Sequence, residues 1–188
     1  WGVPYIASVY GVSPTTAATA VTMIAAGYVA AAPFVGRLAD IMAARGMNLM
    51  AAQRRLLIVT TLLYVATWAP IVLAPGLLPL GAMYVLLFVM GVSVSSASLV
   101  FGIAKDLFPT NVSGLAIGLV NVTSILGGAA MPPVVGWFID RLTAAGIQGG
   151  AVYAKAMVPC LLAACVGLIL VSMVGKPSGR RLRPGYPA

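Results

Sequence analysis

Ionisable side chains are scarce in this chain of 188 residues, and the scarcity limits the chemistry it can perform. There is no histidine, the only acidic residues are Asp40, Asp106 and Asp140, and charged residues make up 7% of the sequence. Soluble domains carry about 25% charged residues, so a soluble globular fold is excluded. Acid–base, hydrolytic and metal chemistry need the side chains that are missing here. We therefore predict that the protein is not an enzyme and that it holds no metal or cofactor.

The positions of the two cysteines and of the basic residues indicate neither a cysteine-based site nor a nucleic-acid-binding site. Cys160 and Cys165 lie five positions apart in one apolar run, where a helix would point them to different faces, so neither a disulfide nor a metal site is indicated. The net charge of +8 comes from eleven basic residues. Nucleic-acid binders gather basic residues in a patch on a soluble fold. Here they stand between long apolar runs, so we predict no nucleic-acid partner.

Apolar sequence is what the chain has in abundance, with 61% hydrophobic residues and a mean hydropathy of +1.05. A helix that spans the lipid bilayer needs about 20 mostly apolar residues. Five runs qualify, so we predict an all-α, polytopic transmembrane bundle over residues 1–175. The expected spans are about 15–38, 56–73, 80–104, 113–138 and 152–174. Residues 1–11 are typical of the end of a further helix and no initiator methionine precedes them, so we interpret the chain as part of a longer protein.

The basic residues predict the orientation of the bundle. Nine of them fall on one predicted side of the membrane, whereas Arg141 and Lys155 fall on the other. By the positive-inside rule, the side with nine is cytoplasmic. The C-terminus, with a basic tail over residues 176–188, is therefore expected in the cytoplasm. The nine residues are Arg37, Arg45, Arg54, Arg55, Lys105, Lys176, Arg180, Arg181 and Arg183.

Small and polar residues form stripes on some of the predicted helices. The runs 56–73 and 152–174 are almost wholly apolar and could face lipid nearly all round, whereas the others carry residues at helical spacings of three and four. We interpret the striped helices as the wall of a polar cleft. One stripe contains Tyr84, Phe88, Gly91, Ser95, Ser98 and Gly102, and another contains Gly114, Gly118, Asn121, Ile125 and Gly128, with Ser124 beside it. The candidates for contact with a substrate are Tyr84, Ser95, Ser98, Asn121 and Ser124.

These stripes have a second interpretation that stays open. Small residues at this spacing commonly let membrane helices pack closely, and for the Gly114–Gly118 pair helix contact is the favoured meaning. Serine hydroxyls can bond to the backbone of their own helix. Asn121 differs, because an amide in mid-membrane needs polar partners and buried polar groups there tend to be functional. For Asn121 we favour a cavity-lining role over a bridge between helices.

Glycine and proline predict a bend in the run 113–138. Pro132 removes the hydrogen bond to the carbonyl of Gly128, and Pro133 removes the bond to the carbonyl of Ala129. The pair Gly127 and Gly128 lies one turn earlier. Whether Gly127, Gly128, Pro132 and Pro133 form a static kink or a moving hinge is left open by the sequence.

A short motif at the end of the first span resembles a known family. Gly36-Arg37-Leu38-Ala39-Asp40 followed by Arg45 is similar to the signature loop of the major facilitator superfamily, in which a weaker copy follows the eighth helix. Ile41, Ala43 and Ala44 depart from the usual residues, which suits that weaker copy. Further similar segments are 1–5, 10–13, 17–18, 108–109, 114–121 and 136–140.

The resemblance covers essentially the whole chain, as the end of helix seven through helix twelve. It implies half of a twelve-helix secondary transporter that moves a small molecule by alternating access, in a cell membrane, most simply the bacterial inner membrane. It also implies that helices eight, ten and eleven line or gate the path, with the amino-terminal half of the same protein as partner. Symport, antiport and proton coupling are left open, and a channel or a structural membrane subunit is the alternative.

The same resemblance gives the motif a role in gating. The candidate gating residues are Gly36, Leu38, Asp40 and Arg45. Asp40, with Arg45 as a local partner, would pair across the halves in one state and separate in the other. The alternative is that Gly36 only permits close packing and the charges mark the membrane interface.

Overall fold

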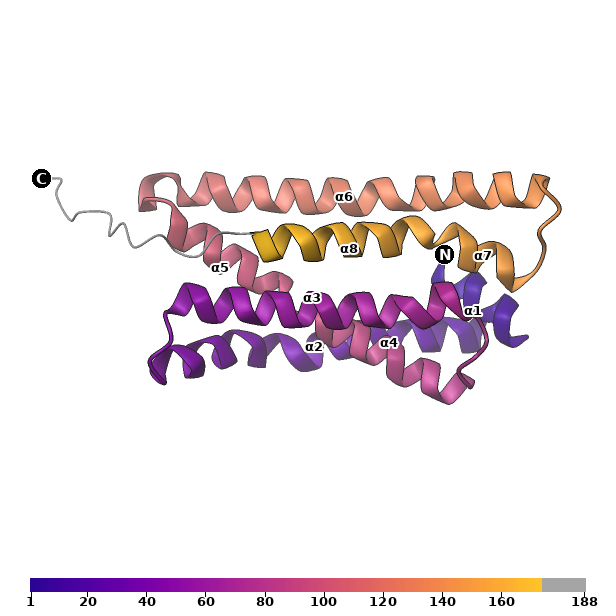
Figure 1. Ribbon diagram of the computed structural model, residues 1–188, viewed down its shortest axis with the longest axis horizontal. Helices are drawn as coiled ribbons and strands as arrows, with labels where there is room; N and C mark the ends of the chain where they lie inside the picture. The colour runs from indigo at the N-terminus through magenta and orange to yellow at the C-terminus, as the bar shows by residue number, and fades with distance from the viewer. Residues whose placement is uncertain (174–188) are drawn as a thin grey trace, which may run out of the picture.

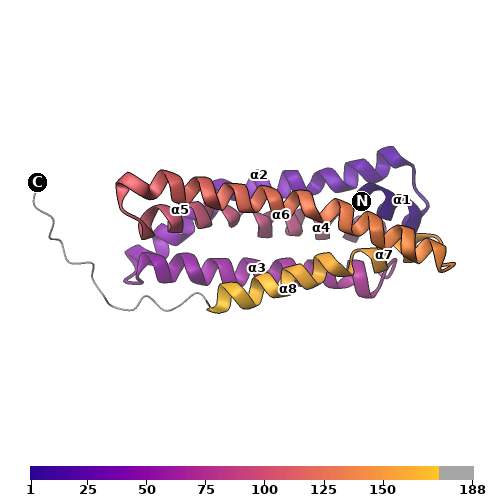
Figure 2. The same ribbon diagram turned by 90° about the horizontal axis from the view of Figure 1, so that it is seen from above.

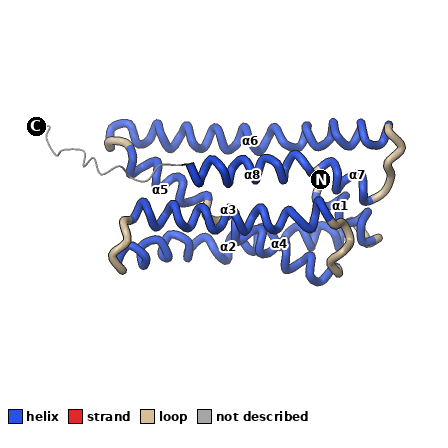
Figure 3. The backbone as a smooth tube through the Cα atoms, viewed as in Figure 1, coloured by secondary structure: helices blue, strands red, loops and turns tan. Residues whose placement is uncertain are grey.

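The computed structural model describes residues 1–173, and every regular element in that range is an α-helix. The predicted all-helical membrane bundle is confirmed. Figures 1 and 3 show the helices lying along one long axis. In chain order they are α1 (Gly2–Tyr10), α2 (Pro14–Ala44), α3 (Leu49–Leu73), α4 (Leu80–Val94), α5 (Ala97–Leu107), α6 (Thr110–Ala144), α7 (Gly150–Ala156) and α8 (Val158–Met173). The predicted basic tail, 176–188, lies outside the described residues.

Five segments of the described chain are long and apolar enough to cross a membrane. They are Pro14–Ala44, Leu49–Leu73, Leu80–Lys105, Thr110–Ala144 and Gly150–Met173. The connections from α2 to α3 and from α5 to α6 lie at one end of the bundle, and those from α3 to α4 and from α6 to α7 lie at the other (Figures 1 and 2). Successive spans therefore alternate in direction, as a chain that crosses a bilayer repeatedly must do.

Several helices extend beyond the apolar runs from which they are predicted. The second span begins at Leu49 instead of near residue 56, because the Asn48 side chain accepts hydrogen bonds from the backbone nitrogens of Met50 and Ala51 and so caps the helix. Arg54 and Arg55 consequently lie inside α3. α6 has 35 residues, which corresponds to about 52 Å at 1.5 Å per residue. It is longer than the hydrocarbon core, so its ends reach into the interfacial regions.

The closest helix pair is α2 with α4, and two glycines make the approach possible. A Cβ atom on Gly27 would overlap the carbonyl oxygen of Phe88 and lie 3.0 Å from the nitrogen of Val92. A Cβ atom on Gly91 would overlap the carbonyl oxygen of Ile24. Backbone packs directly on backbone here, as small residues permit in membrane bundles.

The apolar core lies between α1, α2, α3 and α4, with α7 and the turn before α8 closing it. Buried side chains from all of these elements pack together, and α5 lies apart from them, mainly against α6. The core residues are Tyr5, Ile6, Ala17, Ala20, Ile71, Val72, Met83, Leu87, Met90, Ala154 and Met157.

The third span, predicted over about 80–104, is found as Leu80–Lys105, and within it α4 ends at Val94 and α5 begins at Ala97. α3 does not face lipid all round: it packs against α2, α4 and α8 and buries Gln53 and Thr67. α6, in contrast, continues through Pro132 and Pro133 as a single helix.

Candidate functional site

α6 is exposed on every side from residue 121 to residue 130, so its small and polar face is open to the outside of the bundle. The exposed residues include Asn121 and Ser124. A Cβ atom on Gly114 or on Gly118 would meet nothing within 4 Å. The glycine pair therefore makes no close helix contact within the described residues. Any partner for this face lies outside that part of the chain.

Asn121 and Ser124 lie on this face but differ in their hydrogen bonding. The Ser124 hydroxyl donates to the carbonyl of Val120 at 2.8 Å, so its own helix satisfies it. Across residues 1–173, the Asn121 amide forms no hydrogen bond. An amide in the membrane needs polar partners, and no described residue provides one for Asn121.

The other three candidates do not share that surface. The Tyr84 hydroxyl donates to the carbonyl of Thr16 at 3.2 Å, which links α4 to α2. Ser95 is fully buried and donates to the carbonyl of Val92 at 2.7 Å. Ser98 is exposed and donates to the carbonyl of Ser95 at 2.9 Å. The break at Ser95–Ser96 interrupts the helical register, so the stripe read from residue 84 to residue 102 is not one face.

The signature-like motif lies on the surface at the end of α2. Gly36, Leu38 and Asp40 are exposed, and a Cβ atom on Gly36 would meet nothing within 4 Å. Arg45, also exposed, is the C-cap residue that follows the last residue of α2. Only Ala39 of this stretch is buried in the bundle. The motif is therefore free to contact something other than the described chain.

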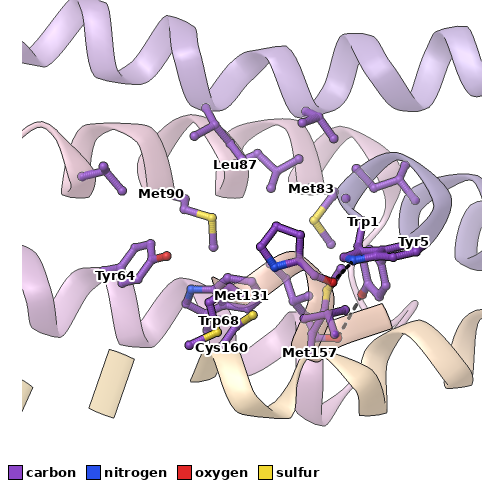
Figure 4. A pocket seen from close by; sticks show the side chains of 18 of the residues that line it. Trp1, Tyr5, Tyr64, Trp68, Met83, Leu87, Met90, Met131, Met157 and Cys160 are labelled. Atoms are coloured by element: carbon purple, nitrogen blue, oxygen red, sulfur yellow. Dashed lines mark hydrogen bonds between the residues drawn. The ribbon is translucent and has the colours of Figure 1, made fainter. Parts of the chain in front are cut away.

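An apolar cavity of about 350 Å³ lies between the helices (Figure 4). Met83, Leu87 and Met90 of α4 lie on one side of it, with Trp68 and Cys160 on the other. Gly128 and Pro132, two of the four hinge candidates, line it together with Trp1, Gly2, Tyr5, Ile6, Val21, Ile24, Tyr64, Ile71, Val94, Met131, Val135 and Met157.

The cavity has few polar groups, and most of these are already paired. The Trp1 indole nitrogen donates to the carbonyl of Pro132 at 2.9 Å, and the Tyr5 hydroxyl donates to the carbonyl of Ile71 at 3.1 Å. Among residues 1–173, the Trp68 indole nitrogen is buried without a partner. None of the described residues that line the cavity carries a carboxylate. None of the five substrate candidates from the sequence lines the cavity, although Gly128 of the same α6 stripe does.

Three polar features of the structure were not found from the sequence. Gln53 is buried and its amide nitrogen lies near Gly102, the Arg54 guanidinium donates to the carbonyl of Ser172 at 2.7 Å, and Thr60 bonds to Ser96 at 2.7 Å. The density of serine from residue 93 to residue 98 is the one sequence signal that could have pointed to this last contact. In the part of the chain that the structure covers, no group of three or more acidic, histidine or cysteine side chains could hold a metal ion.

Comparison with known proteins gives the family. The sequence profile of the Major Facilitator Superfamily matches residues 2–186. No curated protein and no solved structure matches the chain. The match covers almost the entire chain, and the described residues form the apolar helix bundle that such a membrane protein needs. The chain belongs to the Major Facilitator Superfamily, a family of membrane transporters.

Proposed function

We propose that the chain is the carboxy-terminal half of a secondary active transporter that moves a small solute by alternating access. The observation that carries the proposal is the open face of α6, where Gly114, Gly118 and Asn121 lie outside the bundle instead of within it. In this proposal residues 1–175 form the membrane bundle. The tail, 176–188, is cytoplasmic.

α6 carries two stripes of different chemical character. Leu115, Leu119 and Leu126 form an exposed apolar stripe that suits contact with lipid. The stripe with Asn121 suits lipid poorly, because an unpaired amide in hydrocarbon is costly. Water, a solute or the opposite half of the transporter would satisfy it. One helix therefore presents one side to lipid and another to a polar path.

The motif at the end of α2 fits the same arrangement. Asp40 and Gly36 are exposed where a second half could pack against them. We propose that Asp40 makes a contact across the two halves in one state of the cycle and loses it in the other, with Arg45 nearby. Gly127, Gly128, Pro132 and Pro133 are the proposed points at which α6 adjusts during that movement.

Counterflow separates a carrier from a channel or a structural subunit. Proteoliposomes holding the full-length protein are loaded with an excess of one unlabelled solute from a panel of small neutral and charged solutes. Uptake of the same radiolabelled solute is then followed. A carrier gives a transient overshoot for at least one solute, because exchange needs a binding cycle. Conductance without any overshoot would support the channel. The absence of both conductance and overshoot would support the structural subunit.

We predict that the end of the bundle holding Arg45 and Arg55 faces the cytoplasm. The basis is the excess of basic residues at that end, against Arg141 and Lys155 at the other. A membrane-impermeant thiol reagent added to intact cells should label Arg141→Cys but not Arg45→Cys, Arg55→Cys or Arg181→Cys. Permeabilising the cells should expose those three. Labelling of Arg45→Cys and Arg55→Cys in intact cells, with Arg141→Cys protected, would reverse the orientation.

A further inference from the structure

The third membrane span is divided near its middle. The Ser95 nitrogen donates to the carbonyls of Gly91 and Val92 at 3.2 and 3.3 Å. Beyond it, the backbone nitrogen of Ser98 donates to the carbonyl of Ser95 at 3.3 Å, and that of Leu99 donates to the carbonyl of Ser96 at 2.9 Å. Both are bonds between residues three apart. An α-helix needs contacts between residues four apart, so the regular ladder stops between α4 and α5.

Serine hydroxyls make this break tolerable inside an apolar bundle. Each of four hydroxyls donates to a backbone carbonyl three or four residues earlier: Ser93 to Val89, Ser95 to Val92, Ser96 to Ser93 and Ser98 to Ser95. Ser93, Ser95 and Ser96 are buried. Because a buried carbonyl without a donor is costly, the hydroxyls that bond to the carbonyls of Val92, Ser93 and Ser95 stabilise the backbone around the break.

The two parts of the span pack against different helices. α4 lies mainly against α2, where Gly27 and Gly91 bring the backbones together, and against α3. α5 packs chiefly on α6 and has far fewer contacts with α2 and α3. A rotation at Ser95–Ser96 would therefore move α5 together with α6 while α4 stayed fixed to α2.

One side chain ties the break to the rest of the bundle. Thr60 of α3 and Ser96 have their hydroxyl oxygens 2.7 Å apart. Within the described residues, this is the hydrogen bond between two side chains that links α3 to the break between α4 and α5. The Thr60 hydroxyl also lies 2.8 Å from the carbonyl of Leu56, and the Ser96 hydroxyl lies 3.0 Å from that of Ser93. Because the Ser96 hydroxyl donates its single proton to the carbonyl of Ser93, the Thr60 hydroxyl is the donor in the bond to Ser96.

We propose that the Ser95–Ser96 break is a hinge within the span and that Thr60 is a positioning residue, whose hydrogen bond to Ser96 holds α5 and α6 in the arrangement described. The role of this hinge in the transport cycle rests on the proposed function. The movement of α5 relative to α3 does not depend on the proposed function, so it can be measured without a substrate.

The test removes one hydroxyl and keeps the shape of the side chain. Spin labels are placed at exposed positions of the full-length protein after Cys160 and Cys165 are replaced by alanine. The test pair is Leu107→Cys on α5 with Leu62→Cys on α3, and the reference pair is Val85→Cys on α4 with Leu62→Cys. Pulsed electron paramagnetic resonance then gives the distance distributions. Thr60→Val should raise the population of a second distance in the test pair about fivefold, the equivalent of about 1 kcal/mol for one hydrogen bond, and leave the reference pair unchanged.

Two matched variants show whether the effect belongs to this hydrogen bond. Thr60→Ser keeps the hydroxyl and should restore the original distribution. Thr67→Val removes another buried hydroxyl of α3, which bonds only to Tyr64 of its own helix, and should have no effect on either pair. Equal broadening of both pairs, or an unchanged test pair in Thr60→Val, would overturn the hinge. Transport by counterflow can succeed or fail independently of this result, so the two proposals are tested separately.

Discussion

Replacing Gly91 by alanine should destabilise the bundle far more than the addition of one methyl group usually does. The new Cβ atom would overlap the carbonyl oxygen of Ile24 and lie 2.9 Å from the nitrogen of Tyr28. Both are backbone atoms, which cannot turn aside as a flexible side chain can. α2 and α4 would have to separate, so we expect a loss of about 3 kcal/mol or more in the free energy of unfolding. Thermal unfolding of the purified protein, followed by tryptophan fluorescence, measures the change, and the yield of monodisperse protein reports variants that do not fold.

Gly118 provides the matched control. It lies on the open face of α6, where a Cβ atom meets nothing within 4 Å, so Gly118→Ala should be neutral or stabilising by up to about 1 kcal/mol through helix propensity. Gly27→Ala should resemble Gly91→Ala, and the double variant should cost less than the sum, because the helices separate only once. Equal unfolding temperatures for Gly91→Ala and Gly118→Ala would show that α2 and α4 do not pack through Gly27 and Gly91.

Substitutions at Asn121 and at Asp40 should impair transport in different ways. The Asn121 amide is exposed on α6 and unpaired within the described chain, so it is free to bind a solute in the polar path. Asn121→Ala should weaken apparent binding by about 1–3 kcal/mol, a factor of about 5 to 150. Asp40 lies near the end of α2, far along the axis from any mid-membrane ligand. Asp40→Asn should slow turnover and leave equilibrium binding near normal, because it changes the balance of two states.

The measurement is a pair of assays on the full-length protein with the solute that counterflow identifies. Initial uptake rates give the apparent transport constant and the maximal rate, and equilibrium binding gives the affinity. Unchanged kinetics in Asn121→Ala would mean that the amide only bridges helices. Loss of binding in a folded Asp40→Asn protein would contradict the separation of the binding site from the gate.

Membrane physics explains why so much of the fold could be predicted. A span must be long and apolar, and charge must lie near its ends, so hydropathy and the positions of Arg37, Arg45 and Arg141 indicate the helices and their alternation. The ends are less well predicted. Asn48 caps α3 and Gln53 lies in its first turns, so the helix begins before its apolar run. A prediction of helix ends from hydropathy misses such polar residues.

The packing between helices could not be predicted in the same way. Gly27 stands in a segment rich in alanine, and the neighbouring sequence does not show that a Cβ atom there would overlap α4, whereas one on Gly36 would meet nothing within 4 Å. The serines around residue 95 fit a helical stripe by spacing, yet their hydroxyls bond to their own backbone and the helix breaks there. The same spacing argument succeeded in grouping Gly114, Gly118 and Asn121, because α6 stays regular through that region. It could not show that this face points out of the bundle.

Accessibility along α6 tests the central claim, that one side of this helix lines a polar path, most directly. In a background without Cys160 and Cys165, single cysteines replace Gly114, Gly118 and Asn121 on one stripe and Leu115, Leu119 and Leu126 on the other, all of them exposed in the bundle. A small, water-soluble thiol reagent is applied to membranes that contain the full-length protein, and labelled protein is counted by mass spectrometry. The account predicts rapid labelling of the first stripe and little or no labelling of the second. Equal reactivity of the two stripes, or no reactivity on either, would contradict it.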